Sequence, residues 1–381
     1  MGESAMASFL YFDAAEREVN ARLLTELDKI HKSIKLDDDN TASNVAILET
    51  LLDDITKQMA RTDPLFREVL NRLVYTGSYY DGLRTKNADE FDINLVLDLP
   101  FQKCDVSVVG GPSGYVGFKV SQAAIHRLRR EGGEQLLGWM DSENRLLPDK
   151  VKSWLQSVFD RAQRSFNPLG SSSPVAQIRP SQSGPAKTIH IILKDGCNID
   201  VDLVPVLEFK HPDWPECTQR KYWMTRIPKT DRNWFLIPKP PRSNSYLWRL
   251  HFPNMEKRLI EDCGCVKPII RLLKTTRDSY KWNLSSYALK TFVMHEVLIY
   301  DDKNYWHPGN QGMLFVRLLD RLGQALARQG PAIPSIFHPD VDLARDADRA
   351  TRDNISGAVK RIVSKLRDSP EQCKSVLMPG L

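Results

Sequence analysis

Hydrophobic and polar residues alternate along residues 91–99, and the hydrophobic positions are Phe91, Ile93, Leu95, Leu97 and Leu99. A period of two is typical of a β-strand that buries one face. Glu90 and Asp92 stand at polar positions of this pattern, so both carboxylates project from the other face of the strand. Two carboxylates this close repel each other, and the pair therefore favours a divalent cation.

Two further apolar runs, at residues 189–193 and 198–204, flank the turn Lys194-Asp195-Gly196. Two strand-like runs joined by a short turn with glycine predict a β-hairpin. The second run carries Asp200 and Asp202, which share one face for the same reason as the first acidic pair. The chain thus offers a third carboxylate, and either aspartate can supply it.

Apolar residues spaced by three and four predict amphipathic helices elsewhere in the chain. The first covers residues 14–34, a longer one continues to about residue 60, and Asp63-Pro64 begins a third. Further helices are predicted at residues 121–130, 150–165, 314–326 and 355–366. Two segments are predicted to be irregular: a glycine-rich connection at residues 104–115, and residues 167–187, whose serine, proline and glycine content excludes a core element.

Strands followed by helices predict an α/β (α+β) fold, with a mixed β-sheet lobe followed by a helical carboxyl-terminal lobe. We expect the first lobe at residues 1–213 and the second at residues 214–381, with a cleft between them. A chain of 381 residues is long enough for two such lobes with substantial cores.

The composition, with 41% hydrophobic and 27% charged residues, is ordinary for a soluble protein. No apolar run approaches the length that crosses a bilayer, and the amino terminus lacks the basic and apolar regions of a signal peptide. A cytoplasmic location without a membrane partner is therefore expected. The six cysteines are scattered and complete no paired zinc-binding motif, which predicts free thiols and no structural zinc.

The acidic pattern points to phosphate chemistry. Three carboxylates from neighbouring strands can hold two Mg²⁺ or Mn²⁺ ions against a nucleoside triphosphate. A Gly77-Ser78 turn precedes Glu90 by twelve residues. Because glycine lets a ligand approach the backbone closely, this turn is the candidate element for binding the triphosphate.

Basic residues are concentrated between residues 220 and 242, where Asp231 is the only acid. The basic residues there are Arg220, Lys221, Arg226, Lys229, Arg232, Lys239 and Arg242. Together with Arg22, Lys29 and Lys32 of the first predicted helix, they are candidate contacts to the phosphates of a nucleic acid. The alternative for both groups is a solvated surface of charges. Since the net charge is only +5, binding of a polyanion would depend on such clusters.

The segment GSYYDGLRTKNADEFDINLVLDLP resembles polymerase-β-like nucleotidyltransferases, and more closely cyclic GMP-AMP synthase and the cyclic GMP-AMP synthase-like receptors of animals. The resemblance extends over roughly residues 35–340. It implies a bilobal nucleotidyltransferase fold whose spine is the long second helix. The six-residue spacing from Asp202 to Glu208 matches the family, so the resemblance makes Asp202 the third metal ligand, with Asp200 as the alternative. Residues 181–185 stand where the family has an activation loop.

The same resemblance implies nucleotide-binding residues outside the acidic strands. With Gly77 and Ser78, the implied set is Arg249, His251, Glu256, Ser286, Tyr287 and Lys290. Arg249 would contact a base, Tyr287 would stack on one, and Ser286 and Lys290 would reach phosphate. His251 stands where the mammalian synthase has serine. The ordinary alternatives are a buried aromatic residue for Tyr287 and a surface charge for Lys290.

The function implied by the resemblance is the joining of ATP and GTP into a cyclic dinucleotide second messenger of innate immunity. The mammalian synthase carries a zinc-binding insertion that contributes to recognition of double-stranded DNA, and the chain passes from Glu256 to Val266 without room for it. The missing insertion argues against DNA as the trigger. Family members that lack it include receptors for double-stranded RNA, so the resemblance implies double-stranded RNA as the activating ligand, on which oligomers can form. The alternatives are a non-catalytic scaffold or developmental relative of the same fold, and a linear oligoadenylate synthase-type enzyme.

Overall fold

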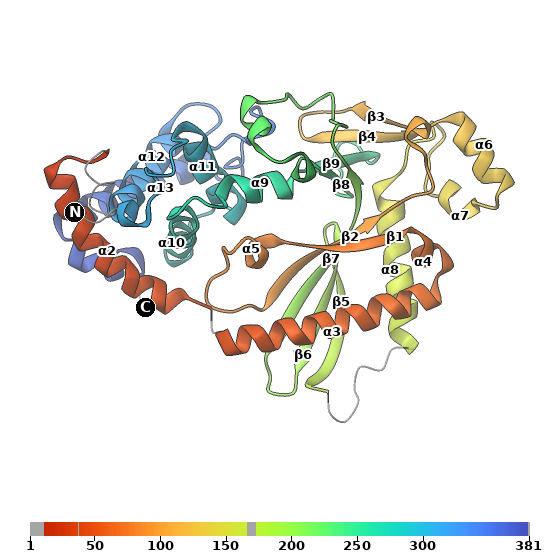
Figure 1. Cartoon of the computed structure of the whole chain (residues 1–381), viewed down its shortest axis with the longest axis horizontal. Helices are drawn as coiled ribbons and strands as arrows, with labels where there is room; N and C mark the ends of the chain where they lie inside the picture. Colours follow the sequence, from red (N-terminus) through yellow and green to blue (C-terminus); the bar gives the residue numbers. More distant parts are fainter. Residues whose placement is uncertain (1–10, 37, 166–172, 380–381) are drawn as a thin grey trace. The chain divides into compact units, whose positions relative to one another are not determined.

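A computed structural model describes residues 11–36, 38–165 and 173–379 of the chain (Figure 1). The chain divides into two compact units, each made of separate stretches of sequence. Unit 1 takes in Met1–Leu36, Gly82–Lys86 and Glu256–Leu381, and unit 2 takes in Asp37–Asp81 and Asn87–Met255. The expected boundary after residue 213 lies inside unit 2. In the described part of the chain, no helix is both long enough and apolar enough to cross a membrane.

Unit 2 is built on a mixed sheet, for which the described residues supply nine strands. Seven of them follow the order β1-β2-β7-β8-β9-β4-β3, while β6 pairs with β7 and carries β5 on its other side. The strands are β1 (Leu70–Thr76), β2 (Glu90–Leu97), β3 (Val106–Gly110), β4 (Tyr115–Val120), β5 (Val175–Ser183), β6 (Ala186–Leu193), β7 (Asn198–Phe209), β8 (Trp234–Ile237) and β9 (Leu247–His251). β2 and β7 are parallel, and their neighbours run antiparallel. The predicted hairpin at residues 194–196 is confirmed.

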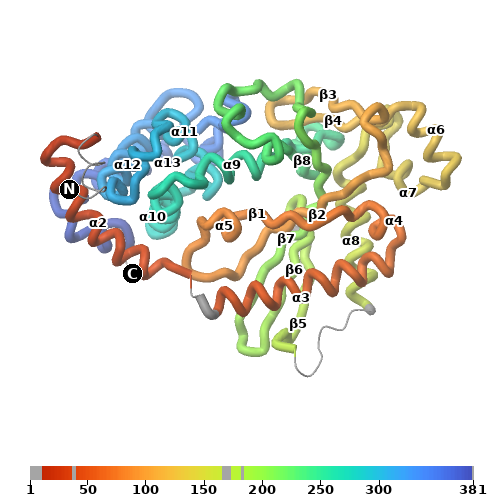
Figure 2. Tube along the Cα trace, in the orientation of Figure 1, coloured from red at the N-terminus to blue at the C-terminus, as the bar shows by residue number. Residues whose placement is uncertain are grey.

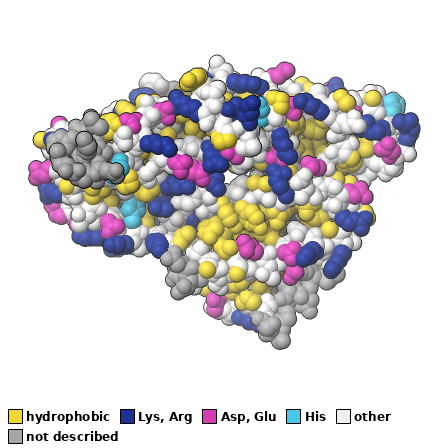
Figure 3. All heavy atoms as spheres, viewed as in Figure 1, with side chains coloured by type: hydrophobic (Ala, Val, Ile, Leu, Met, Phe, Trp, Pro, Cys, Tyr) yellow, Lys and Arg dark blue, Asp and Glu magenta, His cyan; other side chains and the backbone are white. Residues whose placement is uncertain are grey.

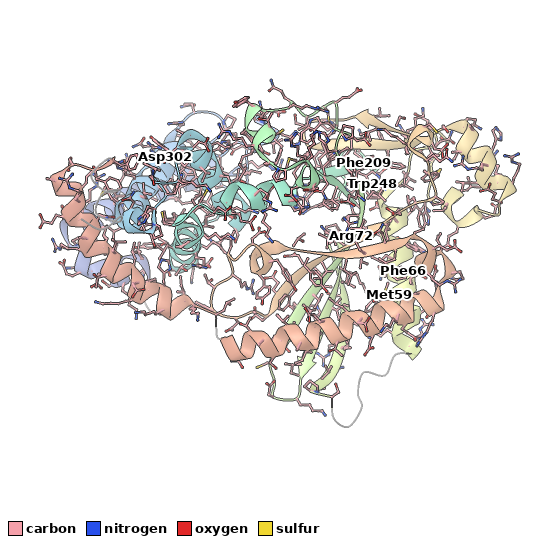
Figure 4. All side chains as sticks on the ribbon, viewed as in Figure 1. Met59, Phe66, Arg72, Phe209, Trp248 and Asp302 are labelled. Carbon is pink, nitrogen blue, oxygen red and sulfur yellow. The ribbon has the colours of Figure 1, made fainter. Side chains whose placement is uncertain are left out.

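Helices cover one face of this sheet. The helices of unit 2 are α3 (Asp38–Thr62), α4 (Pro64–Val69), α5 (Gly77–Tyr80), α6 (Gln122–Arg130), α7 (Glu134–Leu137) and α8 (Pro148–Ser165). The predicted long helix is confirmed as α3, which runs alongside β5 and β6 in Figure 2. Leu51 of α3, Phe159 of α8 and Ile189 of β6 line a common apolar hollow, so both helices pack on this face. Figure 4 labels Met59 of α3 and Phe66 of α4, and both are fully buried.

The prediction that β2 buries a single face holds only for its first residues. Asn94 and Val96 lie on the same face as the acids, yet both are buried. Val96 packs with Val206 of β7 and Phe235 of β8 in a second apolar cluster. The strand therefore begins with an acidic, accessible face and ends buried on both faces, because residues of β7 and β8 cover that end.

Of the nine described strands, six are not predicted by the sequence pattern: β1, β3, β4, β5, β8 and β9. β1 lies between α4 and the Gly-Ser turn, and β3 lies within the segment predicted as a glycine-rich connection. The prediction that residues 167–187 form no core element is wrong for β5 and for the start of β6, and residues 167–172 lie outside the described residues. Among the described strands β5 pairs with β6 alone, so it is an edge strand there. Proline has no backbone N–H to donate, and an edge strand tolerates it because no second neighbour needs that hydrogen bond. Val175 of β5 is buried.

Unit 1 is helical. Its helices are α2 (Ala14–Ile34), α9 (Pro253–Ile260, from Glu256 onward), α10 (Val266–Ser279), α11 (Ser286–Ile299), α12 (Gln311–Ala327), α13 (Arg349–Asp368) and α14 (Cys373–Leu377). Asp13 and Glu16 form a capping box that starts α2. The Asn20 side chain then fixes α2 to α12, since it donates to the carbonyl of Gly309 at 2.7 Å and accepts from the amide of Met313 at 2.8 Å. The predicted mixed sheet and helical carboxyl-terminal region are confirmed.

Candidate active site

The pairing of β2 with β7 brings the predicted acids together in the backbone. Glu90 is the register partner of Asp200, and Asp92 is the partner of Asp202. Residues directly opposite each other in paired strands project from the same face. The intervening residues, such as Phe91, point to the helix-covered face and are fully buried. Four carboxylates from two adjacent strands therefore occupy one face of the sheet in unit 2.

Gly77 lies directly against this face. Its φ of +81° is a conformation that other residues rarely adopt, and the preceding Thr76 is the register partner of Asp92. A Cβ atom built on Gly77 would lie 1.8 Å from Oδ2 of Asp92. Glycine is therefore required both by the backbone conformation and by the Asp92 carboxylate. Ser78 follows in the single turn of α5.

The two aspartates of β7 differ in their hydrogen-bond partners. Thr188 of β6 donates to Oδ1 of Asp202 at 2.5 Å. Asp200 instead contacts a histidine ring, with 2.8 Å between its Oδ1 and Nδ1 of His190. The sequence pattern predicts neither contact, because each contact depends on how β6 and β7 are aligned with each other in the hairpin. In the register of β2 and β7, Asp202 lies opposite Asp92.

The donor set fits a hard cation in its chemistry. Carboxylate oxygens are the ligands that Mg²⁺ and Mn²⁺ prefer, and Glu90, Asp92 and Asp202 supply them from one face. Over the described residues, the side chains as placed form no group of three or more His, Cys, Asp or Glu arranged around a common metal position. The backbone thus aligns the three acids, while binding of a cation would require their side chains to turn toward one another.

An aromatic cluster anchors the Gly-Ser turn on the opposite side. The ring centroids of Tyr79 and Phe91 are 5.1 Å apart, those of Tyr79 and Tyr80 are 4.9 Å apart, and Tyr75 lies 5.0 Å from Tyr80. Burial raises the pKa of the Tyr80 hydroxyl, and nearby Tyr75 raises it further. Figure 3 shows hydrophobic side chains gathered on the side of unit 2 that faces the viewer. The cluster fixes α5, and with it Gly77, relative to the start of β2.

Arg249 and His251 lie on β9, where they pair with β8 residues Ile237 and Phe235. Burial lowers the pKa of Lys239, and the positive charge of the nearby Arg249 guanidinium lowers it further. Two like charges held together in this way attract an anionic ligand. Both residues belong to unit 2, as do the acids.

Glu256, Tyr287 and Lys290 form a hydrogen-bonded cluster within unit 1. Tyr287 donates to Oε1 of Glu256 at 2.7 Å, and Nζ of Lys290 lies 3.0 Å from Oε2. The side chains of Glu256 and Lys290 are only 3% and 10% exposed. Ser286 accepts a hydrogen bond from Arg277 at 3.1 Å. These contacts join α9 to α11, so the residues implied for nucleotide binding also hold unit 1 together.

Replacing Lys290 by methionine is expected to destabilise the protein by about 3 kcal/mol, because the buried Glu256 carboxylate would lose its cation. Tyr287→Phe removes a single hydrogen bond and is expected to cost about 1 kcal/mol. Urea unfolding followed by circular dichroism measures both. Equal stabilities of Lys290→Met and the unmodified protein would show that the ion pair is not maintained in solution.

Models of two domain families match successive parts of the chain. The family described as "Mab-21 protein nucleotidyltransferase domain" matches residues 79–262, and "Mab-21 protein HhH/H2TH-like domain" matches residues 265–361. A cyclic GMP-AMP synthase-like receptor of Tribolium castaneum is 26% identical over 93% of this chain and 91% of its own. The chain belongs to the Mab-21 and cyclic GMP-AMP synthase-like receptor family.

Other members of the family show similar agreement. A cyclic GMP-AMP synthase-like receptor of Aethina tumida is 26% identical over 98% of this chain and 92% of its own. Cyclic GMP-AMP synthase-like receptor 1 of Drosophila melanogaster is 25% identical over 74% of this chain and 76% of its own. The resemblance stated from the sequence is confirmed, and the chain carries a Mab-21 nucleotidyltransferase domain that contains the acids, Arg249, His251 and Glu256.

The basic residues proposed from the sequence fall into two settings. On α2, each cation lies beside a carboxylate: Arg22 is 2.7 Å from Glu371, Lys29 is 2.6 Å from Glu26, and Lys32 is 2.7 Å from Asp28. These three charges are therefore largely neutralised within unit 1.

The basic segment at residues 220–242 lies in unit 2 and exposes aromatic as well as basic side chains. Tyr222 is 80% exposed, and the Arg226 guanidinium lies 5.7 Å from the centre of its ring. Arg220 lies 6.0 Å from the ring of Trp214. Arg232 is structural, since it donates to the carbonyls of Ile227 and Thr225. Lys221, Lys229, Lys239 and Arg242 complete the segment.

Proposed function

We propose that this protein is a nucleic-acid-activated nucleotidyltransferase that makes a cyclic dinucleotide of the cyclic GMP-AMP type from ATP and GTP, with double-stranded RNA as the trigger. The observation that carries the proposal is the register of β2 and β7, which sets Asp92 opposite Asp202 beside Gly77. Membership of the cyclic GMP-AMP synthase-like receptor family supports the same chemistry. A cytoplasmic location remains the prediction from the sequence.

Each residue of the acidic face has a role in this proposal. Glu90, Asp92 and Asp202 would hold two Mg²⁺ or Mn²⁺ ions, which when bound neutralise phosphate charge and lower the pKa of a ribose hydroxyl. Gly77 and Ser78 would bind the triphosphate through the backbone and the hydroxyl. Because Gly77 touches Asp92, the phosphate-binding element and the acids are positioned as one structure.

The remaining nucleotide-binding residues keep the roles that the family implies. Arg249 would contact a base and, with Lys239, would favour an anionic substrate. Tyr287 would stack on the second base, and Ser286 and Lys290 would reach phosphate. In this role Lys290 and Tyr287 would give up their hydrogen bonds to Glu256 and bind the nucleotide instead. Because those hydrogen bonds join α9 to α11, substrate binding would be coupled to the packing of these two helices.

The proposal that RNA is the trigger rests on the basic surface of residues 220–242 and on the short connection between α9 and α10. The segment around Tyr222 and Arg226 offers cations and an exposed ring without a base-reading motif, which suits recognition of an A-form duplex by shape and phosphate contacts. α9 ends at Ile260 and α10 begins at Val266, so the connection is too short for the zinc-binding insertion that contributes to DNA recognition.

The experiment that tests the function is incubation of the full chain with ATP, GTP and Mn²⁺, together with duplex RNA or duplex DNA. Products are resolved by mass and by sensitivity to phosphatase and nuclease. A phosphatase-resistant cyclic product formed only with RNA is expected. A linear 2′–5′ oligomer would indicate an oligoadenylate synthase-type enzyme, and no product with either duplex would indicate a non-catalytic relative.

Charge reversal tests the RNA surface separately from the chemistry. The double variant Arg226→Glu/Lys229→Glu is expected to weaken RNA binding and to lower the slope of log affinity against log salt by about 0.7–0.9 for each phosphate that the protein no longer binds. Lys150→Glu, an exposed residue on α8, is the matched control and should bind RNA as the unmodified protein does. Equal salt slopes for all three proteins would place the RNA elsewhere.

A further inference from the structure

A histidine stands beside the acidic face without a role in the chemistry proposed above. His190 lies on β6, and its register partners are Asp200 on β7 and Arg179 on β5. Ser181 of β5 and Thr188 of β6 are paired with each other in the same register. All of these side chains project from the face that carries Asp92 and Asp202, because directly opposite residues share a face.

Hydrogen bonds connect three of these strands through the imidazole ring. Nδ1 of His190 lies 2.8 Å from Oδ1 of Asp200, and Nε2 lies 2.8 Å from Oγ of Ser181. An ionised carboxylate only accepts hydrogen bonds, so Nδ1 carries the proton and donates to Asp200. In the neutral ring Nε2 is then an acceptor, and the Ser181 hydroxyl donates to it. The ring thus ties β5 to β7 across β6.

The two aspartates of β7 have different partners on this face. Each accepts one hydrogen bond on Oδ1, Asp200 from the imidazole ring and Asp202 from the Thr188 hydroxyl. A carboxylate offers about four acceptor positions, so both keep capacity for a cation after these bonds are made. What distinguishes Asp200 is its anchor, because the imidazole ring ties its carboxylate to Ser181 of β5.

We propose that His190 is a positioning residue: by binding Asp200 and Ser181 it fixes the Asp200 carboxylate and links the β5–β6 hairpin to the acidic strand β7, which also carries Asp202. This inference rests on the proposed function for the identity of the reaction. The turn of the β5–β6 hairpin lies within residues 181–185, the predicted activation loop. A movement of Ser181 would therefore shift the Asp200 carboxylate through the His190 ring that binds both.

The tautomer of His190 tests the network without any enzymatic activity. Long-range ¹H–¹⁵N spectra of the ¹⁵N-histidine-labelled chain are expected to show His190 with its proton on Nδ1, whereas a free imidazole prefers Nε2. Asp200→Ala is expected to return the ring to the Nε2 form. A ring that is Nε2-protonated in the unmodified chain would overturn the proposal, whatever reaction the protein catalyses.

Activity then tests the positioning role. His190→Ala is expected to lower kcat about 10-fold with little change in the KM for ATP, because the acids are misaligned while the nucleotide contacts stay intact. His190→Asn, whose amide can donate from near the Nδ1 position, is expected to recover most of kcat. Gln177→Ala on β5, a residue that accepts from Arg179, is the matched control and should leave kcat unchanged.

The outcomes separate this inference from the function on which it rests. Full activity of His190→Ala would overturn the positioning role while leaving the transferase intact. If the unmodified chain makes no product, the proposed transferase function is wrong. The catalytic role of His190 would then be wrong as well, even if the tautomer confirms its hydrogen bonds. Covalent labelling of Ser181 by a fluorophosphonate would mark it as a nucleophile instead, since serine, histidine and aspartate in this order also form hydrolase triads.

Discussion

Product formation is expected to fall by at least about 10²- to 10³-fold in Asp92→Asn, because the substitution removes one of the three carboxylates proposed to hold the cations. Asparagine is nearly the same size, and Asp92 lies on the accessible part of β2, so the thermal midpoint should stay within about 2 °C. Mass spectrometry of the products at saturating ATP, GTP and Mn²⁺ measures the effect, and binding to duplex RNA is measured on the same preparation.

Asp98→Asn is the matched control for this change. Asp98 directly follows the same strand, is exposed, and accepts a hydrogen bond from Asn71. It lies at the far end of β2 from Asp92 and should retain full activity. If Asp92→Asn and Asp98→Asn made product at the same rate, the assignment of the acidic face would be wrong.

Gly77→Ala is expected to lower product formation by about 10²-fold, because an added methyl group would displace the Asp92 carboxylate and the triphosphate bound beside it. The Cβ atom would lie 1.8 Å from Oδ2 of Asp92, a distance that no rotation of alanine can relieve. In addition, alanine at a φ of +81° costs about 1–2 kcal/mol of folding free energy. Urea unfolding and the product assay measure the two effects separately.

Gly196→Ala is the control that separates displacement of the Asp92 carboxylate from the folding free energy lost when alanine adopts a positive φ. Gly196 lies in the β6–β7 turn with a φ of +88°, and a Cβ atom there would meet no atom within 4 Å. The Gly196→Ala variant should therefore lose a similar amount of folding free energy because of its backbone conformation, and it should keep its activity. Loss of activity in Gly196→Ala to the same extent would mean that Gly77 acts through general stability rather than through Asp92.

Local patterns were sufficient for the elements that carry the acids. The period of two placed Glu90 and Asp92 on one face of a strand, and β2 begins at Glu90. Spacings of three and four located α2 over Ala14–Ile34 with the bounds predicted. These predictions succeed because the side-chain period of a helix or strand is set by its own backbone.

Strands with weak periodicity were missed. β5 contains Pro180 together with serines and glutamines, and its sequence alone is typical of a loop. It becomes a strand because β6 offers a row of backbone partners from Val175 opposite Leu193 to Ser183 opposite Ala186, with one register shift between Val175 and Gln177. Burial of Val96 was likewise missed, because the residues that cover it come from β7 and β8. In both cases the deciding residues are distant in the sequence.

The sequence by itself determined which residues of each strand and helix share a face, and so which acids belong together on β2 and on β7. Only the tertiary structure decided that Asp92 lies opposite Asp202, that Gly77 touches Asp92, and that His190 binds Asp200. The physical reason is that periodicity is a property of a few consecutive residues. Strand register and side-chain partners instead follow from packing between segments that are distant in the sequence.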